Sequence, residues 1–389
     1  MTSTASPPAA DASVRVREIP QGESLKAFME LSWTINAADP NWVPPLRGEL
    51  KTLLDRGKHP FHKHADVAYY IAERGGRPVG RVAAVVNRLY NEFHGDRVGF
   101  FGLFECVDDE AVARALLDAA ARWLQGRGMD TMRGPMNLST NEELCSPGVL
   151  VDGFDTPPKV LMGHNPPWYG RLMDAAGMEK SKDLLAYFAP TPDLPERTEK
   201  LFEKIVQREK AVIRPLEMRR LREEVEKIKE IYNAAWQRNW GFVPLTDDEF
   251  EHMVKSLKPI VDPDLCFIAE KDGEPIGFSL ALPDFNQVLR KIRSGRLLPF
   301  GIFRILWERR KIHTLRHITL GFKPEYQHAG LGAAFYLRTF RTGAAKGYRE
   351  AEGSWILEDN TEMRGALEKM GVAVYKTYRV YDRALAPAS

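Results

Sequence analysis

Paired cysteines are missing from this sequence. Its 389 residues include three cysteines, Cys106, Cys145 and Cys266, and no two of them lie at a short spacing. The distribution therefore indicates neither a disulfide framework nor a cysteine zinc site. Serine and cysteine nucleophile motifs with a partner histidine and acid are missing as well, so we do not expect a covalent enzyme intermediate.

Long apolar runs and a strong charge are also absent. No apolar stretch approaches the ~18 residues of a membrane-spanning helix, and the N-terminus has no basic and then apolar signal. The 55 Lys and Arg residues nearly balance the 53 Asp and Glu residues, leaving a net charge of +2. This charge is too small to indicate nucleic acid as a partner, and we expect a cytoplasmic protein.

One histidine cluster deserves a separate test as a metal site. His59, His62 and His64 lie close together in a loop that also contains Lys and Pro. The neighbouring sequence offers no fourth ligand, which a structural zinc site would need. We therefore expect exposed histidines and no metal.

The most informative stretch covers residues 317–332, His-Ile-Thr-Leu-Gly-Phe-Lys-Pro-Glu-Tyr-Gln-His-Ala-Gly-Leu-Gly. It predicts a strand that stops at a proline, a polar loop, and a helix that begins near Gly332. Gly330 and Gly332 have no Cβ, so the backbone can approach a ligand where the first helical amides lack partners. Such a loop is suited to bind a phosphate or pyrophosphate.

The order of residues in this loop distinguishes between nucleotide-binding motifs. It matches neither Gly-x-x-x-x-Gly-Lys-Ser/Thr nor Gly-x-Gly-x-x-Gly. It reads Gln-x-x-Gly-x-Gly from Gln327 to Gly332, and the segments 355–360 and 366–371 follow as a strand end and a helix end. Together these three segments resemble the acyl-CoA loop and the next two elements of the GNAT superfamily of N-acyltransferases.

The second half of the chain repeats the pattern of the first. Residues 239–245 echo 41–46, residues 266–282 echo the hairpin at 70–85, and residues 360–371 echo 165–177. An internal repeat predicts two copies of one unit. With the resemblance, it predicts an α+β protein of two tandem GNAT-like domains, each a mixed, mostly antiparallel twisted sheet flanked by helices. The expected parts are a flexible tail (1–13), an N-terminal domain (14–189), a linker (190–198) and a C-terminal domain (199–385).

The two copies differ where the ligand loop should lie. In place of Gln327 to Gly332, the first copy has residues 104–110, Phe-Glu-Cys-Val-Asp-Asp-Glu, without glycine. Carboxylates at the start of the helix would repel a pyrophosphate. We therefore expect acyl-CoA, either acetyl-CoA or a longer thioester, to bind the C-terminal copy alone.

The resemblance implies roles for residues of the second copy. The amides of the loop would hold the pyrophosphate, Asn360 would contact the pantetheine arm, and the amide near Phe322 would stabilise the thioester oxygen. The implied acyl-CoA residues are Phe322, Gln327, His328, Ala329, Gly330, Leu331, Gly332, Ala333 and Asn360.

The base and the acid are harder to identify, because two expected residues are absent. The strand at 318–322 has no glutamate, and the usual tyrosine acid is replaced by Leu367. Glu352 on the next strand is the first candidate base, and Glu142 from the other copy is the second. Tyr375 is the candidate acid, with Tyr378 and Tyr381 as alternatives that would otherwise serve packing.

The first copy contains a long polar connection at 134–158. Long loops in compact domains are often functional, so its polar residues are candidates to bind an amine acceptor. The same side chains also suit turns and caps that satisfy the backbone of the loop itself. The candidate acceptor residues are Asn137, Asn141, Glu142, Asp152 and Asp155.

A further segment, residues 285–316, mixes Arg and Lys with large apolar side chains at near-helical spacing. The pattern fits a helix packed on the domain, a lid over a long acyl chain, or a helix on a membrane surface. A monomer and a dimer are both compatible with the sequence.

Three functions remain open. The first is an acyl-CoA-dependent N-acyltransferase, expected to use acetyl-CoA and the primary amine of a small molecule or amino acid. The second is a non-catalytic acyl-CoA sensor or adaptor. The third is an aminoacyl transferase of the Fem type, which the intact pyrophosphate loop argues against.

Overall fold

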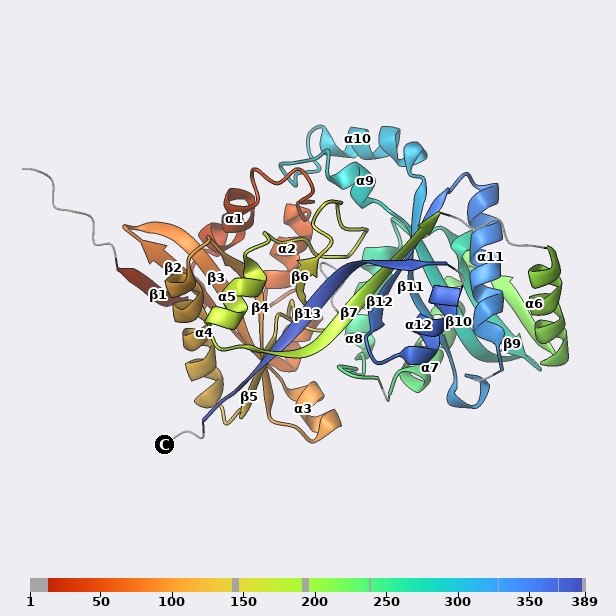
Figure 1. Ribbon diagram of the computed structural model, residues 1–389, viewed down its shortest axis with the longest axis horizontal. Coiled ribbons are helices and arrows are strands. Elements are labelled where there is room, and N and C mark those ends of the chain that lie inside the picture. Colours follow the sequence, from red (N-terminus) through yellow and green to blue (C-terminus); the bar gives the residue numbers. More distant parts are fainter. Residues whose placement is uncertain are drawn as a thin grey trace, which may run out of the picture.

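The computed structural model shows an elongated molecule in which the two halves of the chain lie end to end (Figure 1). It describes residues 13–141, 147–190, 196–237, 239–327, 329–369 and 371–386. Two expected site residues, Glu142 and His328, and most of the expected tail and linker lie outside these residues.

The first half begins as an antiparallel sheet covered by helices. Its strands are β1 (Val14–Ile19), β2 (Ala65–Arg74), β3 (Arg77–Asn87), β4 (Val98–Cys106), β5 (Thr131–Gly134), β6 (Val149–Asp152) and β7 (Glu179–Pro190). Its helices are α1 (Lys26–Ile35), α2 (Arg47–Leu54), α3 (Arg88–His94), α4 (Glu110–Gln125) and α5 (Tyr169–Ala175), with a 3-10 turn η1 (Pro60–Lys63).

The second half repeats this order of elements. Its strands are β8 (Ala211–Pro215), β9 (Cys266–Lys271), β10 (Glu274–Pro283), β11 (Thr314–Phe322), β12 (Glu350–Leu357) and β13 (Ala373–Ala384). Its helices are α6 (Glu196–Arg208), α7 (Leu221–Ala235), α8 (Asp247–Leu257), α9 (Asn286–Leu289), α10 (Gly301–Glu308), α11 (Leu331–Ala345) and α12 (Thr361–Lys369). Short 3-10 turns are η2 (Met218–Arg220), η3 (Pro263–Leu265), η4 (Arg309–Lys311) and η5 (Pro324–Tyr326).

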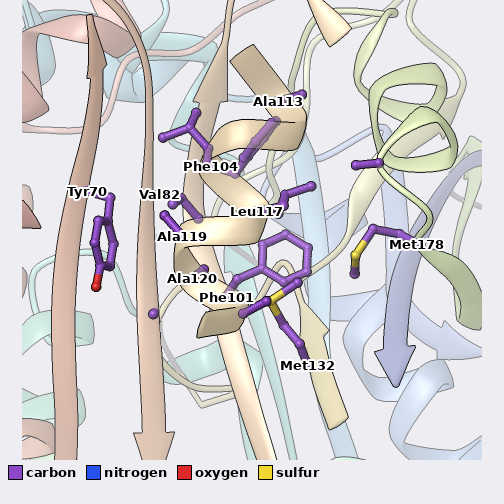
Figure 2. Packing of buried hydrophobic residues seen from close by; sticks show 14 of the residues in the cluster. Tyr70, Val82, Phe101, Phe104, Ala113, Leu117, Ala119, Ala120, Met132 and Met178 are labelled. Carbon is purple, nitrogen blue, oxygen red and sulfur yellow. The ribbon is translucent and has the colours of Figure 1, made fainter. Parts of the chain in front are cut away.

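Helix α4 shows how the sequence produces the packing of the first half. The Asp109 side chain accepts hydrogen bonds from the amides of Ala111 and Val112, which caps the helix. The apolar side of α4 lies on β2, β3 and β4 (Figure 2). A Cβ on Gly80 would lie 2.6 Å from Leu116 Cδ1, so the glycine is what allows this close approach.

The two halves exchange their last strands. Strand β13, from the second half, pairs with β5 and β6 of the first, while β7, from the first half, pairs with β12 of the second. Because β7 and β13 also pair with each other, the halves form one 13-stranded sheet rather than two separate sheets. The α+β class is confirmed, and only β4–β5 and β11–β12 are parallel pairs among the described strands.

The expected insertion forms α9, α10 and η4, and its last residues already belong to β11. In Figure 1, α10 lies at the outer edge of the molecule above α9. Among the described residues, no helix is both long and apolar enough to cross a membrane.

Candidate active site

Strands β11 and β12 separate part of the way along their length. They pair in parallel only from Thr314 to His317 and from Glu350 to Gly353. Beyond these residues β11 keeps β10 as its neighbour, and β12 keeps β7. The separation leaves a gap in the sheet between residues 318–322 and 354–357.

A cavity of about 380 Å³ adjoins this gap and lies between the sheet, α7 and α8. Polar side chains occur near the gap, namely Arg316, His317, Thr319, Ser354 and Asn360. The rest of the lining is mainly apolar and aromatic, including Val225, Ile228, Tyr232, Trp236, Phe250, Met253, Val254, Leu257, Phe278 and Leu280. The cavity therefore combines a polar end near the gap with a mainly apolar lining elsewhere, as ligand sites commonly do.

A buried carboxyl group lies next to the polar end. Glu352 on β12 is 1% exposed, and its Oε2 accepts a hydrogen bond from the hydroxyl of Tyr375, which lies on β13. Its Oε1 accepts a hydrogen bond from Ser354, whose hydroxyl also accepts one from Arg316 Nε at 2.8 Å. Ser354 lines the cavity and thus connects the cavity with Glu352.

Burial and charge act in opposite directions on Glu352. Removal from water raises its pKa, whereas Arg316, whose Nε lies 3.5 Å from Oε1, and the Ser354 hydrogen bond lower it. The effect of burial is larger, and the pKa is about 7. A carboxyl group with this pKa exchanges a proton readily near neutral pH, as a general base must.

Lys376 is a further buried charge close to this cluster. It is 0% exposed and donates hydrogen bonds to the carbonyls of Gly153 and Thr156, the latter at 2.7 Å. Burial lowers its pKa to about 8, and the charge of Glu352 opposes this shift. Lys376 therefore fastens the 153–156 loop of the first half beside the carboxyl cluster.

The acyl-CoA loop predicted from the sequence begins helix α11. Gly330 precedes the helix with a φ of +77°, a conformation that favours glycine. A Cβ on Gly332 would meet Leu320 Cδ2 at 3.5 Å, and Leu320 lines the cavity. No described side chain caps the first-turn amides at Leu331 to Ala333, which suits an anionic group, and α11 itself reaches the cavity one turn later through Tyr336.

Other predicted acyl-CoA residues have different surroundings. Asn360 lines the cavity, and its Oδ1 accepts a hydrogen bond from the amide of Met363. Gln327 donates to the carbonyls of Ala235 and Phe322, both at 3.3 Å, and so ties the loop to α7. Phe322 is 4% exposed, its ring stacks on Phe335, and it is not among the cavity residues.

The first half has counterparts of the α11 start and of the gap beside β11, namely the start of α4 and the space beside β4. Both are filled by atoms of the protein itself. The Asp109 carboxylate already accepts from the first amides of α4. Next to β4, the chain passes so close that a Cβ on Gly102 would lie 1.6 Å from the carbonyl oxygen of Met136. Asn137, an expected acceptor residue, closes this contact by accepting from the amide of Leu103 at 3.0 Å.

The remaining expected acceptor residues do not form one group. Asn141 lines the cavity, donates to the carbonyl of Val243 and accepts from the Tyr232 hydroxyl. Asp152 and Asp155 are exposed on the first half and are not among the cavity residues. The structure thus brings Asn141, but not Asp152 or Asp155, to the cavity.

The expectation of exposed histidines is wrong for His59, which is 7% exposed and contacts the His252 ring edge-on. His64 is bonded to Glu249 at 2.9 Å, which links η1 to α8. Within the described part of the chain, no group of three or more His, Cys, Asp or Glu side chains is placed to hold a metal ion.

Sequence reasoning missed Ser354, Arg316 and Lys376. Ser354 follows Glu352 by two residues, so the period of a strand places both on one face, and this was a usable signal. Arg316 lies opposite Glu352 only because β11 and β12 pair in this register. Lys376 reaches the site only because the two halves exchange strands, and nothing in the local sequence indicates this.

Sequence comparisons reveal relatives that match almost the whole chain. Residues 225–372 match the model of the acetyltransferase (GNAT) family. The bacterial ceramide synthase of Caulobacter vibrioides is 39% identical over 383 residues, which cover 96% of this chain and 98% of the relative. The protein YghO of Escherichia coli is 36% identical over 378 residues, which cover 95% of each chain.

A solved structure shows the same arrangement of two halves. A tandem GNAT protein from the clavulanic acid biosynthesis pathway aligns with a TM-score of 0.54 at 12% identity. The alignment covers 97% of this chain and 100% of that protein. At this identity the likeness supports the fold alone, and it agrees with the tandem arrangement expected from the internal repeat.

Proposed function

Because the chain belongs to the GNAT family of acyltransferases, we propose that it transfers a long acyl chain from acyl-CoA to the primary amine of a long-chain lipid. The product is then an N-acyl amide, and the second half of the chain binds the acyl donor. The reaction uses acyl-CoA and therefore belongs in the cytoplasm.

The apolar cavity is the observation that carries this proposal. Its volume of about 380 Å³ lies in the range of roughly 300–1,000 Å³ found for small-molecule sites. An acetyl group would leave the side chains of α7 and α8 without a partner, whereas an acyl chain would cover them. Burial of methylene groups contributes about 0.8 kcal/mol each, so the lining selects for chain length.

The support for a lipid acceptor comes from the name of a relative, not from a contact in the structure of this protein. The Caulobacter relative is named a bacterial ceramide synthase, and ceramide contains a fatty acyl chain joined to the amine of a long-chain base. This chain aligns with 98% of that protein, so both halves are shared. A long-chain amino lipid is thus a better-supported acceptor than the amino acid or other small-molecule amine expected from the sequence.

The residues at the polar end account for the proton transfers. An amine with a pKa near ~10 arrives mostly protonated, so it must lose a proton before it attacks. In our proposal the Ser354 hydroxyl passes this proton to Glu352, to which it is hydrogen bonded. The amine nitrogen then bonds to the thioester carbon and the carbon–sulfur bond breaks. Once Glu352 has passed its first proton to Tyr375, it accepts the second proton of the nitrogen through Ser354, and the amide and CoA are formed.

Two further groups complete the proposed chemistry. The amides of β11 beyond His317 that face away from β10 have no β12 partner and can donate to the oxygen of the thioester. The Tyr375 hydroxyl is the proposed acid, because it can give a proton to the departing thiolate and regain one from Glu352. Arg316 holds Ser354 in position.

The test is to incubate the purified protein with palmitoyl-CoA and sphinganine and to measure thiol release together with the amide by mass spectrometry. Parallel reactions use acetyl-CoA as donor and glutamate as acceptor. We expect palmitoyl-CoA and sphinganine to form amide at least tenfold faster than the reaction with acetyl-CoA as donor or the reaction with glutamate as acceptor. Binding of palmitoyl-CoA without thiol release from any amine would instead identify an acyl-CoA sensor.

A further inference from the structure

Large apolar side chains are exposed together on one segment of the second half. Seven of the twelve exposed large apolar residues of the described chain lie within 297–307. Leu298, Phe300, Phe303 and Trp307 are 74%, 78%, 67% and 74% exposed. Phe300, Phe303 and Trp307 follow the i, i+3, i+7 spacing, so α10 presents them on one side. Scattered exposed apolar residues need no explanation, but a cluster of this kind marks an interaction site.

The same segment is strongly basic. Residues 285–313 contain eight Lys and Arg residues and one acid, Glu308, a net charge of +7 in a chain whose total is +2. The other residues of the chain are therefore acidic overall. Glu308 is paired with Lys291 and Lys311, whereas Arg309 and Arg310 pair with no carboxylate among the described residues.

The inner side of the segment is already bound to the first half. The Trp33 indole donates to the carbonyl of Arg293 at 3.0 Å, and the Arg47 amide donates to the carbonyl of Gly295 at 2.9 Å. The Arg293 side chain donates to the carbonyl of Trp42 at 2.6 Å. These contacts fix the residues that precede α10 against the first half. The exposed side chains of α10 therefore face away from it, and Figure 1 shows this helix at the edge of the molecule.

We propose that residues 290–311, the α10 surface, dock on the surface of a membrane that contains anionic lipids. Aromatic and leucine side chains enter the boundary between head groups and acyl chains, and the arginines contact the anionic head groups. A second protein copy would explain the apolar side chains but not the excess of positive charge, because two such surfaces would repel each other.

The docking test uses vesicle flotation and is independent of catalysis. Wild-type protein is mixed with vesicles made of equal parts phosphatidylglycerol and phosphatidylcholine, or of phosphatidylcholine alone. We expect binding to the anionic vesicles that weakens at high salt, because salt screens the arginines. The variants Phe303→Ser with Trp307→Ser, and Arg309→Glu with Arg310→Glu, should each reduce binding at least about tenfold.

A matched control replaces exposed apolar residues elsewhere. Leu201 and Val212 are 55% and 60% exposed, so the variant Leu201→Ser with Val212→Ser should bind like the wild type. Equal thermal midpoints confirm that all variants are folded. The proposal is overturned if the wild type stays unbound, or if Phe303→Ser with Trp307→Ser binds normally. It is also overturned if light scattering shows a dimer that this variant dissociates while vesicle binding persists.

The docking proposal and the proposed reaction can fail separately. Vesicle binding needs no acyl transfer, and thiol release can be measured with substrates in detergent micelles. Variants of the α10 surface should keep their rate in detergent and lose it when the acceptor is held in anionic vesicles. An inactive protein that still floats would refute the reaction alone.

Discussion

Glu352 lies where desolvation outweighs the opposing effects of a neighbouring charge and a hydrogen bond. Arg316 and the hydrogen bond from Ser354 favour its ionised form, and burial favours the neutral form. Because burial has the larger effect, the carboxyl group is poised to accept a proton near neutral pH. The same side chain on the surface would be ionised and a weaker base.

The first prediction concerns this proton. In wild-type protein, kcat should rise with pH through about 7 and then level off, because Glu352 must be ionised to act as a base. The variant Glu352→Gln cannot accept a proton, and its kcat should fall by about 10²–10⁴. Glu350→Gln, two residues earlier on the same strand, is the matched control and should keep both rate and profile.

Two readouts separate this role from a purely structural one. Since the Ser354 hydrogen bond lowers the pKa of Glu352, Ser354→Ala should move the midpoint of the rate profile to higher pH. Folding raises the pKa of Glu352 above its ordinary 4.5, so the carboxyl group destabilises the fold as pH rises from 4.5 to 7. The thermal midpoint of Glu352→Gln should therefore rise relative to that of the wild type as the pH increases from 4.5 to 7. An unchanged profile in Ser354→Ala would refute the assignment.

Some of these residues were predictable from the sequence and some were not. The sequence indicated Glu352 and Tyr375 as base and acid, and the structure joins them by a hydrogen bond, although their catalytic roles stay predictions. It also indicated Asn137 for the acceptor, where the structure shows a backbone contact to Leu103. A polar residue in a loop has the same sequence signature whether its partner is a ligand or a neighbouring amide.

At the scale of elements, the starts of α4 and α11 differ in whether the chain itself satisfies the first amides of the helix. In α4 a carboxylate of the chain itself, that of Asp109, satisfies the first amides. In α11 the residue before the helix is Gly330, which has no side chain to do so. The orphan amides and the positive end of the helix dipole are left for an external anion.

The second prediction tests this anion site by thermal unfolding with CoA. A ligand at one hundred times its Kd stabilises the folded state by about 2.7 kcal/mol, so the wild-type midpoint should rise. In Gly332→Glu the new carboxylate suits the helix start but repels the pyrophosphate, and we expect the shift to disappear.

Gly332→Ala is the matched control, because it adds a Cβ without charge, and that Cβ has room at 3.5 Å from Leu320. It should keep most of the CoA shift. Equal loss in both variants would show that the backbone, rather than charge, governs this position. A full shift in Gly332→Glu would place CoA elsewhere.

At the scale of the whole molecule, the exchanged strands make the two halves one folding unit. Without β13 the first half would expose the edge of β5, and without β7 the second half would expose the edge of β12. The exchange also assembles the candidate site, since Glu352 lies on β12, Tyr375 on β13, and the loop that Lys376 fastens belongs to the first half.

The third prediction follows from this dependence. Chains 1–195 and 196–389 produced separately should be aggregated or unfolded, because each lacks the strand that completes its sheet. Produced together, they should form a soluble one-to-one complex with a single cooperative unfolding transition. Size-exclusion chromatography and circular dichroism measure both outcomes. A folded, monomeric second half on its own would contradict the prediction.

The sequence by itself determined the α+β class, the internal repeat and the glycine-containing loop from which α11 begins. These depend on local patterns, namely strand and helix periodicity, helix caps and glycines, which act over a few residues. Only the tertiary structure decided which strand completes which half, how Arg316, Ser354 and Lys376 surround Glu352, and where the apolar cavity lies. Strand pairing between distant segments and the burial of a charge depend on the whole chain, and no short stretch of sequence contains them.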